Sequence, residues 1–225
     1  MDELQRGRVM AASPLLAGVP ADDVAALARA ATVRRYRRGQ LLFCEGDPGD
    51  SLLVVAEGTL KAFHTSPHGD ELLLAVVEPP QALGELTVAD GGARSLSVSA
   101  LTAAVVLRVP RDALLEVAAR SPALTRALLA SLAGVVRRLT GAAADLVFLD
   151  IPRRVAKFVL TLRDADGSDV VRTRLTQTDM ADRVGASRQS LNAALQEFQR
   201  RGWITVGPGE IRIRDVEALR RFVGA

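Results

Sequence analysis

The sequence predicts an α+β protein with three parts: an N-terminal antiparallel β-roll of the jelly-roll type, a long helix, and a C-terminal winged helix-turn-helix. The first observation is a series of short apolar runs, separated by turns, between Val33 and Pro110. The second is a pair of capped amphipathic helices followed by a short hairpin, over residues 175–213. The predicted domains are residues 1–120, 121–149 and 150–225.

Composition restricts the class of protein. A chain of 225 residues forms one large domain or two small ones, and its apolar fraction of 48% is enough for real cores. We expect no membrane span and no signal peptide, because no apolar run is long enough and the first residues carry acids. The single cysteine, Cys44, excludes an internal disulfide and a four-cysteine iron–sulfur cluster, which fits a reducing cytoplasm.

The elements before Arg111 follow from local patterns. Ser13-Pro14 is expected to open a helical start, which continues with Val24, Leu27, Ala28 and Ala31 on one face. Apolar runs such as LLF, SLLVVAEG, ELLLAVV and AAVVLRV then alternate with turns such as EGDPGD and SPHGD. This even spacing is typical of an antiparallel β-barrel or jelly roll.

A helical period returns at Arg111. After Ser121-Pro122 the apolar residues step by fours and threes, close to a heptad seam. The stripe is longer than the remaining elements can cover, so we expect a second copy of the same helix to cover it; packing on its own barrel is the alternative. Asp150-Ile151-Pro152 is expected to be a hinge and residues 163–169 a loop. The stripe comprises Leu124, Leu128, Leu132, Val135, Leu139, Ala142 and Leu146.

Residues 175–213 have the pattern of a DNA-reading helix-turn-helix with a wing. Thr176 can cap the first helix with Asp179 completing a capping box, and Ser187 can cap the second. Gly202 ends the second helix, and the strands ITV and EIRI form the wing. The second helix buries an apolar face and leaves the opposite face free. That apolar face comprises Leu191, Leu195 and Phe198.

The free face of the second helix carries side chains with the length and donor pattern to reach base edges in a major groove. Residues 151–225 hold 14 Lys and Arg against 9 Asp and Glu, whereas residues 1–150 hold 15 against 17. The positive excess therefore coincides with this pattern, as binding of double-stranded DNA requires. The candidate base-reading residues are Arg188, Gln189 and Asn192, and the candidate phosphate contacts are Thr176, Thr178 and Ser187.

A short cassette inside the β region has the chemistry of an anion site. Gly84 lets backbone N–H groups approach an anion closely, Arg94 can neutralise a phosphate, and Ser95 adds donors. Glu85 can accept a hydrogen bond from a ribose hydroxyl. The alternative is a tight turn with a surface ion pair between Glu85 and Arg94, since short motifs have many false matches.

Four stretches carry a resemblance to a known family: RGQLLFCEGDPGDSLLVVAEGTLKAF, GELTVADGGARSLSV, FLDIPRRVAKF and LTQTDMADRVGASRQSLNAALQEFQRRGWI. Together they resemble the cyclic AMP receptor protein (CRP/FNR) family of bacterial transcription regulators, most of all its actinobacterial branch. The resemblance implies a homodimer with a cyclic-nucleotide-binding β-roll, a dimerisation helix and a winged helix-turn-helix, with RNA polymerase as a further partner. It assigns Arg94 and Ser95 to the cyclic phosphate, Glu85 to the ribose 2′-hydroxyl, and Gly84 and Leu86 to backbone contacts.

The chain departs from the family pattern at two sites. In the family a threonine of the dimer helix and the next residue of the partner subunit hold the adenine amino group. Counting back from Phe148 places Leu139 and Thr140 there, and leucine cannot accept a hydrogen bond. This implies weaker cyclic AMP binding, another nucleotide, or a ligand-independent member with a relic pocket. Gln189 replaces a glutamate and Ala193 a basic residue, so the operator should differ.

An enzyme of the cupin jelly-roll type is the competing class. Its sites need several histidine or glutamate ligands for a metal, whereas the two histidines here, His64 and His68, flank a turn. We therefore expect no catalytic residues, no metal, no cofactor and no membrane partner. The run from Arg34 to Arg38 is expected to be a solvated strand face, with contact to RNA polymerase or DNA as the lesser alternative.

Overall fold

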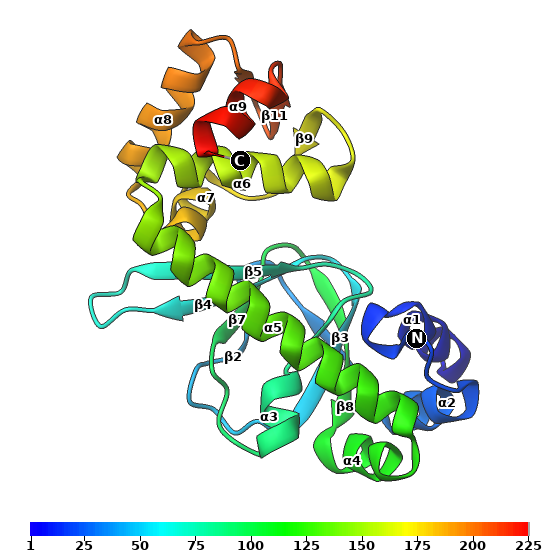
Figure 1. Cartoon of the computed structure of the whole chain (residues 1–225). Helices are drawn as coiled ribbons and strands as arrows, with labels where there is room; N and C mark the ends of the chain where they lie inside the picture. Colours follow the sequence, from blue (N-terminus) through cyan, green and yellow to red (C-terminus); the bar gives the residue numbers. More distant parts are fainter. Residues whose placement is uncertain (225) are drawn as a thin grey trace. The chain divides into compact units, whose positions relative to one another are not determined.

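The computed structural model describes residues 1–224, and its chain divides into two compact units (Figure 1). The first unit comprises Met1–Thr65 and Leu74–Arg138, and the second comprises Ser66–Leu73 and the residues from Leu139 onward. The buried apolar residues are divided in the same way. Two clusters belong to the first unit, and one, within residues 155–219, belongs to the second.

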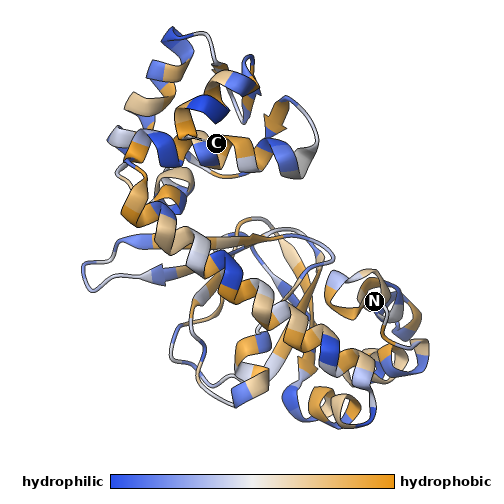
Figure 2. Cartoon of the chain, in the orientation of Figure 1, coloured by the Kyte–Doolittle hydropathy of each residue, from blue (hydrophilic) through white to orange (hydrophobic). Residues whose placement is uncertain are grey.

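The predicted β-roll is confirmed as two four-stranded antiparallel sheets. The sheet orders are β1-β8-β3-β6 and β2-β7-β4-β5. Strand β3 lies between the two clusters of the first unit, because Leu52 and Val54 enter one cluster while Leu53 and Val55 enter the other. This is why its sequence is apolar at successive positions (Figure 2). The strands are β1 (Thr32–Tyr36), β2 (Leu41–Phe43), β3 (Ser51–Glu57), β4 (Leu60–Thr65), β5 (Glu71–Val77), β6 (Ala82–Leu83), β7 (Ser97–Ala100) and β8 (Ala104–Pro110).

The helical start differs from the prediction. Helix α1 (Glu3–Ala12) begins earlier, at a capping box in which Asp2 and Gln5 bond each other's backbone N–H. Ser13 ends this helix and, with Pro14 at the first position, also opens the short 3₁₀ helix that follows, while its buried hydroxyl has no partner in the described structure. A short 3₁₀ turn, η1 (Pro14–Leu16), leads to α2 (Ala21–Ala30). The apolar face predicted for that helix is confirmed, since Val24, Leu27, Ala28 and Ala31 are all buried.

Helices α4 (Arg111–Arg120) and α5 (Pro122–Phe148) follow the roll. The predicted apolar stripe on α5 is divided: its first residues are buried in the protein's own core, and its last residues are exposed. Leu124 is fully buried, and Leu128 packs beside it against the first unit's own core, so the first turns of the stripe follow the alternative interpretation. A second set of apolar residues, here called the exposed seam, repeats at intervals of seven, three and seven. It comprises Leu129 and Val136, each 61% exposed, with Leu139 at 50% and Leu146 at 52%.

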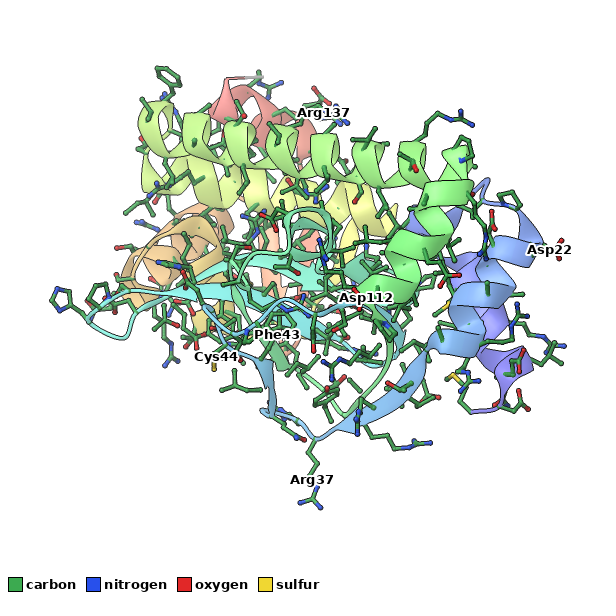
Figure 3. All side chains as sticks on the ribbon, turned by 90° about the horizontal axis from the view of Figure 1, so that it is seen from below. Asp22, Arg37, Phe43, Cys44, Asp112 and Arg137 are labelled. Carbon is green, nitrogen blue, oxygen red and sulfur yellow. The ribbon has the colours of Figure 1, made fainter. Side chains whose placement is uncertain are left out.

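Helix α5 also has the length and mean hydropathy of a membrane span, which the sequence analysis did not expect. Arg137 and Arg138 lie in the middle of this apolar stretch, and Arg137 projects outward from the helix (Figure 3). Each arginine costs about 2.5–3.5 kcal/mol at the centre of a bilayer on insertion scales. Contact with a second protein surface explains an apolar seam beside two arginines more simply than a membrane span does.

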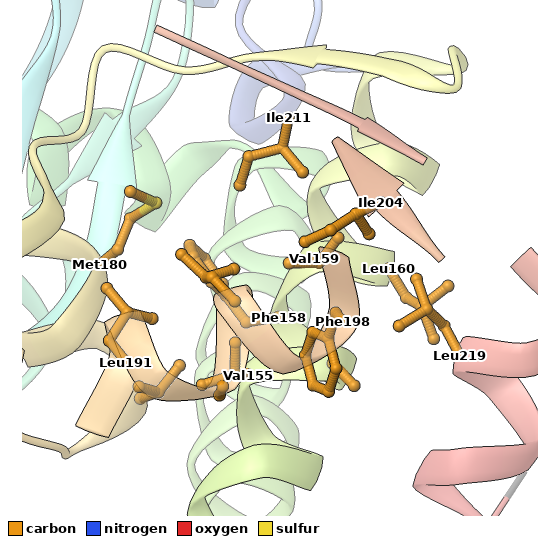
Figure 4. Packing of buried hydrophobic residues seen from close by; sticks show 14 of the residues in the cluster. Val155, Phe158, Val159, Leu160, Met180, Leu191, Phe198, Ile204, Ile211 and Leu219 are labelled. Atoms are coloured by element: carbon orange, nitrogen blue, oxygen red, sulfur yellow. The ribbon is translucent and has the colours of Figure 1, made fainter. Parts of the chain in front are cut away.

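The second unit is a winged helix-turn-helix built on α6. Asp150 caps α6 by accepting a hydrogen bond from the backbone N–H of Arg153 at 3.0 Å. Val155, Val159 and Phe198 meet at the centre of its core (Figure 4). The elements are α6 (Ile151–Asp166), β9 (Val170–Arg172), α7 (Gln177–Val184), α8 (Arg188–Arg200), β10 (Ile204–Gly207), β11 (Glu210–Ile213) and α9 (Val216–Val223).

Helix α6 is longer, and the wing has one strand more, than the sequence predicts. The loop expected over residues 163–169 is mostly helix, because α6 continues to Asp166 and ends at Gly167, whose φ is +64°. The wing has a third strand, β9, which pairs with β11 so that Val171 faces Ile211. Val171 is 2% exposed, and its burial explains why this short segment is held in the sheet.

Candidate functional site

The cassette predicted in the β region forms a short helix and the residues around it. Gly84 precedes α3 (Glu85–Asp90) with a φ of +94°, a left-handed conformation that favours glycine. A Cβ at this position would lie 2.5 Å from Nη1 of Arg94 and 3.1 Å from the carbonyl oxygen of Ser51. Gly84 is therefore needed both for the turn and for the close approach of the arginine.

Arg94 points into the protein. It is 5% exposed, and its Nη1 donates to Oγ1 of Thr87 at 3.0 Å. Its Nη2 donates to the carbonyl oxygen of Ser51 at 2.8 Å and to its Oγ at 3.1 Å. The guanidinium also lies over the ring of Phe43 at 4.3 Å, on the strand shown beside Cys44 in Figure 3. The surface ion pair considered as an alternative is therefore wrong, because the arginine is not at the surface.

The charge of Arg94 is balanced only in part. Burial lowers the pKa of the Arg94 guanidinium from its ordinary value, and the Asp50 carboxylate, 3.8 Å from Nη2, opposes that shift. Asp50 is itself held by Arg108, whose hydrogen bond is the main cause of a lowered Asp50 pKa. The Nε of Arg94 is buried and has no hydrogen-bond partner in the described structure. A buried cation with an unused N–H group is able to bind an anion.

Glu85 is bonded to helix α5 and not to Arg94, the partner considered in the sequence analysis. Its Oε1 accepts a hydrogen bond from Oγ of Ser131 on α5 at 2.9 Å. Ser131 carries no motif, and only this contact between distant segments identifies it. The other cassette residues, Leu86 and Ser95, are exposed at the surface of the roll.

Leu139 and Thr140 are exposed residues of α5, with Leu139 in the exposed seam. Both belong to the second unit, whereas Glu85 and Arg94 belong to the first. Their assignment to the adenine end of a pocket stays a prediction.

The helix-turn-helix has the caps that its sequence predicts. Oγ1 of Thr176 accepts a hydrogen bond from the backbone N–H of Asp179 at 3.1 Å, and Oδ2 of Asp179 accepts one from that of Thr176 at 2.9 Å. Oγ of Ser187 accepts a hydrogen bond from the backbone N–H of Ser190 at 3.1 Å. Gly185 ends α7 with a φ of +62°. These local bonds fix the angle at which α8 leaves the turn.

The predicted base-reading residues share one face of α8. Nε of Arg188 and Nδ2 of Asn192 each donate to Oε1 of Gln177 at 3.3 Å. Arg188 and Gln189 are exposed, as are the candidate phosphate contacts Thr176, Thr178 and Ser187. Sequence reasoning missed Gln177, although its place directly after the capping threonine is a usable signal. The arrangement presents donors and acceptors on an exposed helix, the chemistry of a base-reading surface.

The end of α5 contacts the helix-turn-helix within the second unit. Nζ of Lys157 lies 2.6 Å from Oδ1 of Asp145. Arg154 donates to the carbonyl oxygen of Gly185 at 3.3 Å, at the turn between α7 and α8. Burial lowers the pKa of Arg183, and the charge of Asp145 opposes this shift. The turn is thus bonded to α6, and α6 is in turn bonded to the end of α5 through Lys157.

An enzyme of the cupin type needs a cluster of metal ligands. The described residues contain no group of three or more side chains able to hold a metal ion. His64 lies on β4, where its Nδ1 is 2.7 Å from Oε2 of Glu45, and His68 lies in the turn that follows, as predicted.

Comparisons with known proteins agree with both the β-roll and the helix-turn-helix. A cyclic nucleotide-binding domain model matches residues 33–121, and a Crp-like helix-turn-helix domain model matches residues 153–222. The chain is 36% identical over 218 residues to the CRP-like cAMP-activated global transcriptional regulator of Mycobacterium tuberculosis, covering 95% of this chain and 97% of that protein. It is 29% identical over 213 residues to the cyclic AMP receptor protein of Thermus thermophilus, covering 95% and 98%.

A solved structure supports the same assignment. A CRP-family transcriptional regulator from Thermus thermophilus superposes with a TM-score of 0.68 and 25% identity, covering 85% of this chain and 97% of that one. A β-roll of the cyclic nucleotide-binding type joined to a Crp-like helix-turn-helix defines a DNA-binding transcription regulator. The chain belongs to the CRP/FNR family of bacterial transcription regulators.

Proposed function

We propose that this regulator is a homodimer whose affinity for its operator is set by a cyclic nucleotide bound in the β-roll. We assign the effector-binding roll to residues 1–120, the dimerisation helix to residues 121–149 and the DNA-binding domain to residues 150–225. The observation that carries the proposal is the buried guanidinium of Arg94, whose Nη1 lies against Gly84 of the cassette and whose Nε–H has no partner among the described residues.

The phosphate and the ribose of the proposed ligand each have a partner in the cassette. Arg94 and Ser95 bind the cyclic phosphate, and Glu85 accepts a hydrogen bond from the ribose 2′-hydroxyl. Backbone groups of Gly84 and Leu86 complete the site. Of the five N–H donors of a guanidinium, Arg94 uses three within the protein, which leaves two for phosphate oxygens.

The base end decides which nucleotide is preferred. We place Leu139, with Thr140 of the partner subunit, beside the base. Leu139 offers no acceptor for the amino group of adenine, so cyclic AMP binds more weakly than it would beside a threonine. The same leucine supports a second candidate function, in which the pocket is a relic and operator binding does not depend on a ligand.

The exposed seam of α5 is the proposed dimer interface. Four large apolar side chains at heptad intervals are at least half exposed in the single chain, and a second copy of the helix buries them. A dimer places two copies of α8 on half-sites about one helical turn apart. In each copy Arg188, Gln189 and Asn192 read bases, while Thr176, Thr178 and Ser187 contact phosphates. The dimer acts in the cytoplasm together with RNA polymerase.

Calorimetry and DNA binding on the same preparation test the proposal. We expect the protein to sediment as a dimer, to bind cyclic AMP or another cyclic nucleotide, and to bind a selected pseudo-palindromic duplex more tightly when the nucleotide is present. Affinity for DNA should fall by orders of magnitude between low and moderate salt, since a dimer of this kind neutralises roughly 6–10 phosphates. Tight, specific DNA binding with no cyclic nucleotide bound at millimolar concentration would establish the relic function instead.

A further inference from the structure

Ser131 makes a contact that a serine in a helix does not usually make. A serine in the middle of a helix commonly turns its hydroxyl to solvent or back to the carbonyl of residue i−4. Thr125, near the start of the same helix, does this, because its Oγ1 donates to the carbonyl oxygens of Ala118 and Ser121. The hydroxyl of Ser131 is instead directed away from its own helix, to Oε1 of Glu85 at 2.9 Å.

This bond fixes a carboxylate that would otherwise be free to rotate. Glu85 is the first residue of the six-residue helix α3, and its side chain is half-buried. A glutamate side chain has many rotamers and loses entropy when it is ordered, so one firm hydrogen bond has a large influence on where the carboxylate lies. Ser131 engages Oε1 alone, and no hydrogen bond to Oε2 occurs within residues 1–224.

We propose that Ser131 is a positioning residue that sets the preference of the site for a ribose over a 2′-deoxyribose. This inference rests on the proposed function, in which Glu85 accepts a hydrogen bond from the ribose 2′-hydroxyl. Ser131 holds one oxygen of the carboxylate and thereby presents the other to the sugar. Because Ser131 belongs to α5 and Glu85 to α3, the sugar-binding carboxylate is also tied to the helix that carries the exposed seam.

The test compares two nucleotides that differ by one hydroxyl. Calorimetry or competition binding is done with cyclic AMP and with 2′-deoxy cyclic AMP on the full-length parent and on Ser131→Ala. We expect Ser131→Ala to weaken cyclic AMP binding by roughly 5- to 20-fold, the range expected when a hydrogen bond to a charged group is lost in part. Binding of the deoxy nucleotide should change less than about twofold, since it has no hydroxyl for Glu85 to accept.

Two further variants separate positioning from folding. Ser131→Thr keeps a hydroxyl on the same helix face and should restore most of the ribose preference. Thr125→Ala removes a hydroxyl from the same helix that bonds only to backbone carbonyls, and it should leave both nucleotides unaffected. Thermal unfolding of all variants verifies that they are folded at the temperature of the assay.

The outcomes distinguish this inference from the proposed function. If the parent binds cyclic AMP and Ser131→Ala weakens both nucleotides equally, the positioning role is wrong while the nucleotide-gated function stands. An equal loss in Ser131→Thr and Ser131→Ala would also overturn it. If the parent binds no cyclic nucleotide at all, the proposed gating and this inference are both wrong.

Discussion

Arg94 in the β-roll and Arg188 in the helix-turn-helix carry the same guanidinium group in opposite settings. Arg94 is 5% exposed and makes three hydrogen bonds at 2.8–3.1 Å. Arg188 is exposed, and the one hydrogen bond of its Nε, to Gln177, is 3.3 Å long. The first arginine is held before any ligand arrives, whereas the second is free to change its rotamer when a base edge comes within reach.

The difference follows from what each group must recognise. A small anion offers few contacts, so its affinity depends on donors that are already desolvated and placed. A duplex offers many phosphates, and its sequence is read by a few side chains that adapt to the groove. In the DNA-binding unit the caps at Thr176 and Ser187 hold the backbone beneath exposed side chains.

The largest expected effect is that of Arg94→Ala. Removing a preplaced guanidinium deletes two charge-assisted hydrogen bonds to the phosphate, each worth about 1.5–3 kcal/mol, so binding should fall roughly 100-fold or more. Calorimetry with cyclic AMP measures the loss. Arg35→Ala, which removes an exposed arginine from β1, is the matched control and should bind as the parent does. Equal losses in the two variants would mean that Arg94 has no special role.

Arg188→Ala should have a smaller effect and one of a different kind. A bidentate contact to guanine is worth about 1–3 kcal/mol of discrimination, so the variant should lose preference for its operator more than general affinity for DNA. Selection from random duplexes measures this. Arg200→Ala removes the same charge from the end of α8 and should lower affinity without changing the selected sequence.

Gln189→Glu should change the preferred base at one position of each half-site, because a carboxylate only accepts hydrogen bonds, whereas an amide also donates them. Selection from random duplexes measures this change as well. An operator that is unchanged in both Arg188→Ala and Gln189→Glu would show that α8 is wrongly oriented.

Thr176→Ala addresses the order beneath the reading surface. Loss of the capping box should lower the free energy of unfolding of the second unit by about 1 kcal/mol. Denaturant unfolding followed by Trp203 fluorescence reports on that unit. Thr161→Ala, at an exposed helical site with a bond to its own backbone, should change stability by less than about 0.5 kcal/mol. If the two variants are equally stable, the cap contributes nothing measurable.

The smallest expected effect concerns the base end of the effector site. Leu139→Thr adds an acceptor and should strengthen cyclic AMP binding by about 1 kcal/mol, the net value of one hydrogen bond. Leu139→Ala shortens the side chain without adding an acceptor and serves as the control. Sedimentation of both variants is needed, because Leu139 also lies in the exposed seam. A parent that binds cyclic AMP at micromolar concentration, with no change in Leu139→Thr, would contradict the placement of Leu139 at the base.

Features that depend on nearby residues could be predicted from the sequence. The caps at Thr176 and Ser187 and the succession of short strands and turns in the roll all arise within a few residues, and the structure confirms them. Ser13-Pro14 does open a helical segment, but only the 3₁₀ helix η1, and the capping box of Asp2 and Gln5 was the local signal for the helix before it. The inward orientation of Arg94 and the bond from Ser131 to Glu85 join segments that are far apart in the chain, and no local pattern specifies them.

The arginines of β1 have a consequence for the behaviour of the protein in concentrated solution. Strand β1 is at the end of its sheet and, within residues 1–224, pairs only with β8, which leaves a row of backbone groups able to bond a strand from another molecule. Arg34 and Arg35 are exposed along this strand, and Arg37 projects from the turn after it (Figure 3). Repulsion between these cations keeps two such edges apart. Solubility should therefore decrease as salt screens the charges, and replacing the arginines with neutral residues should favour aggregation of the folded protein.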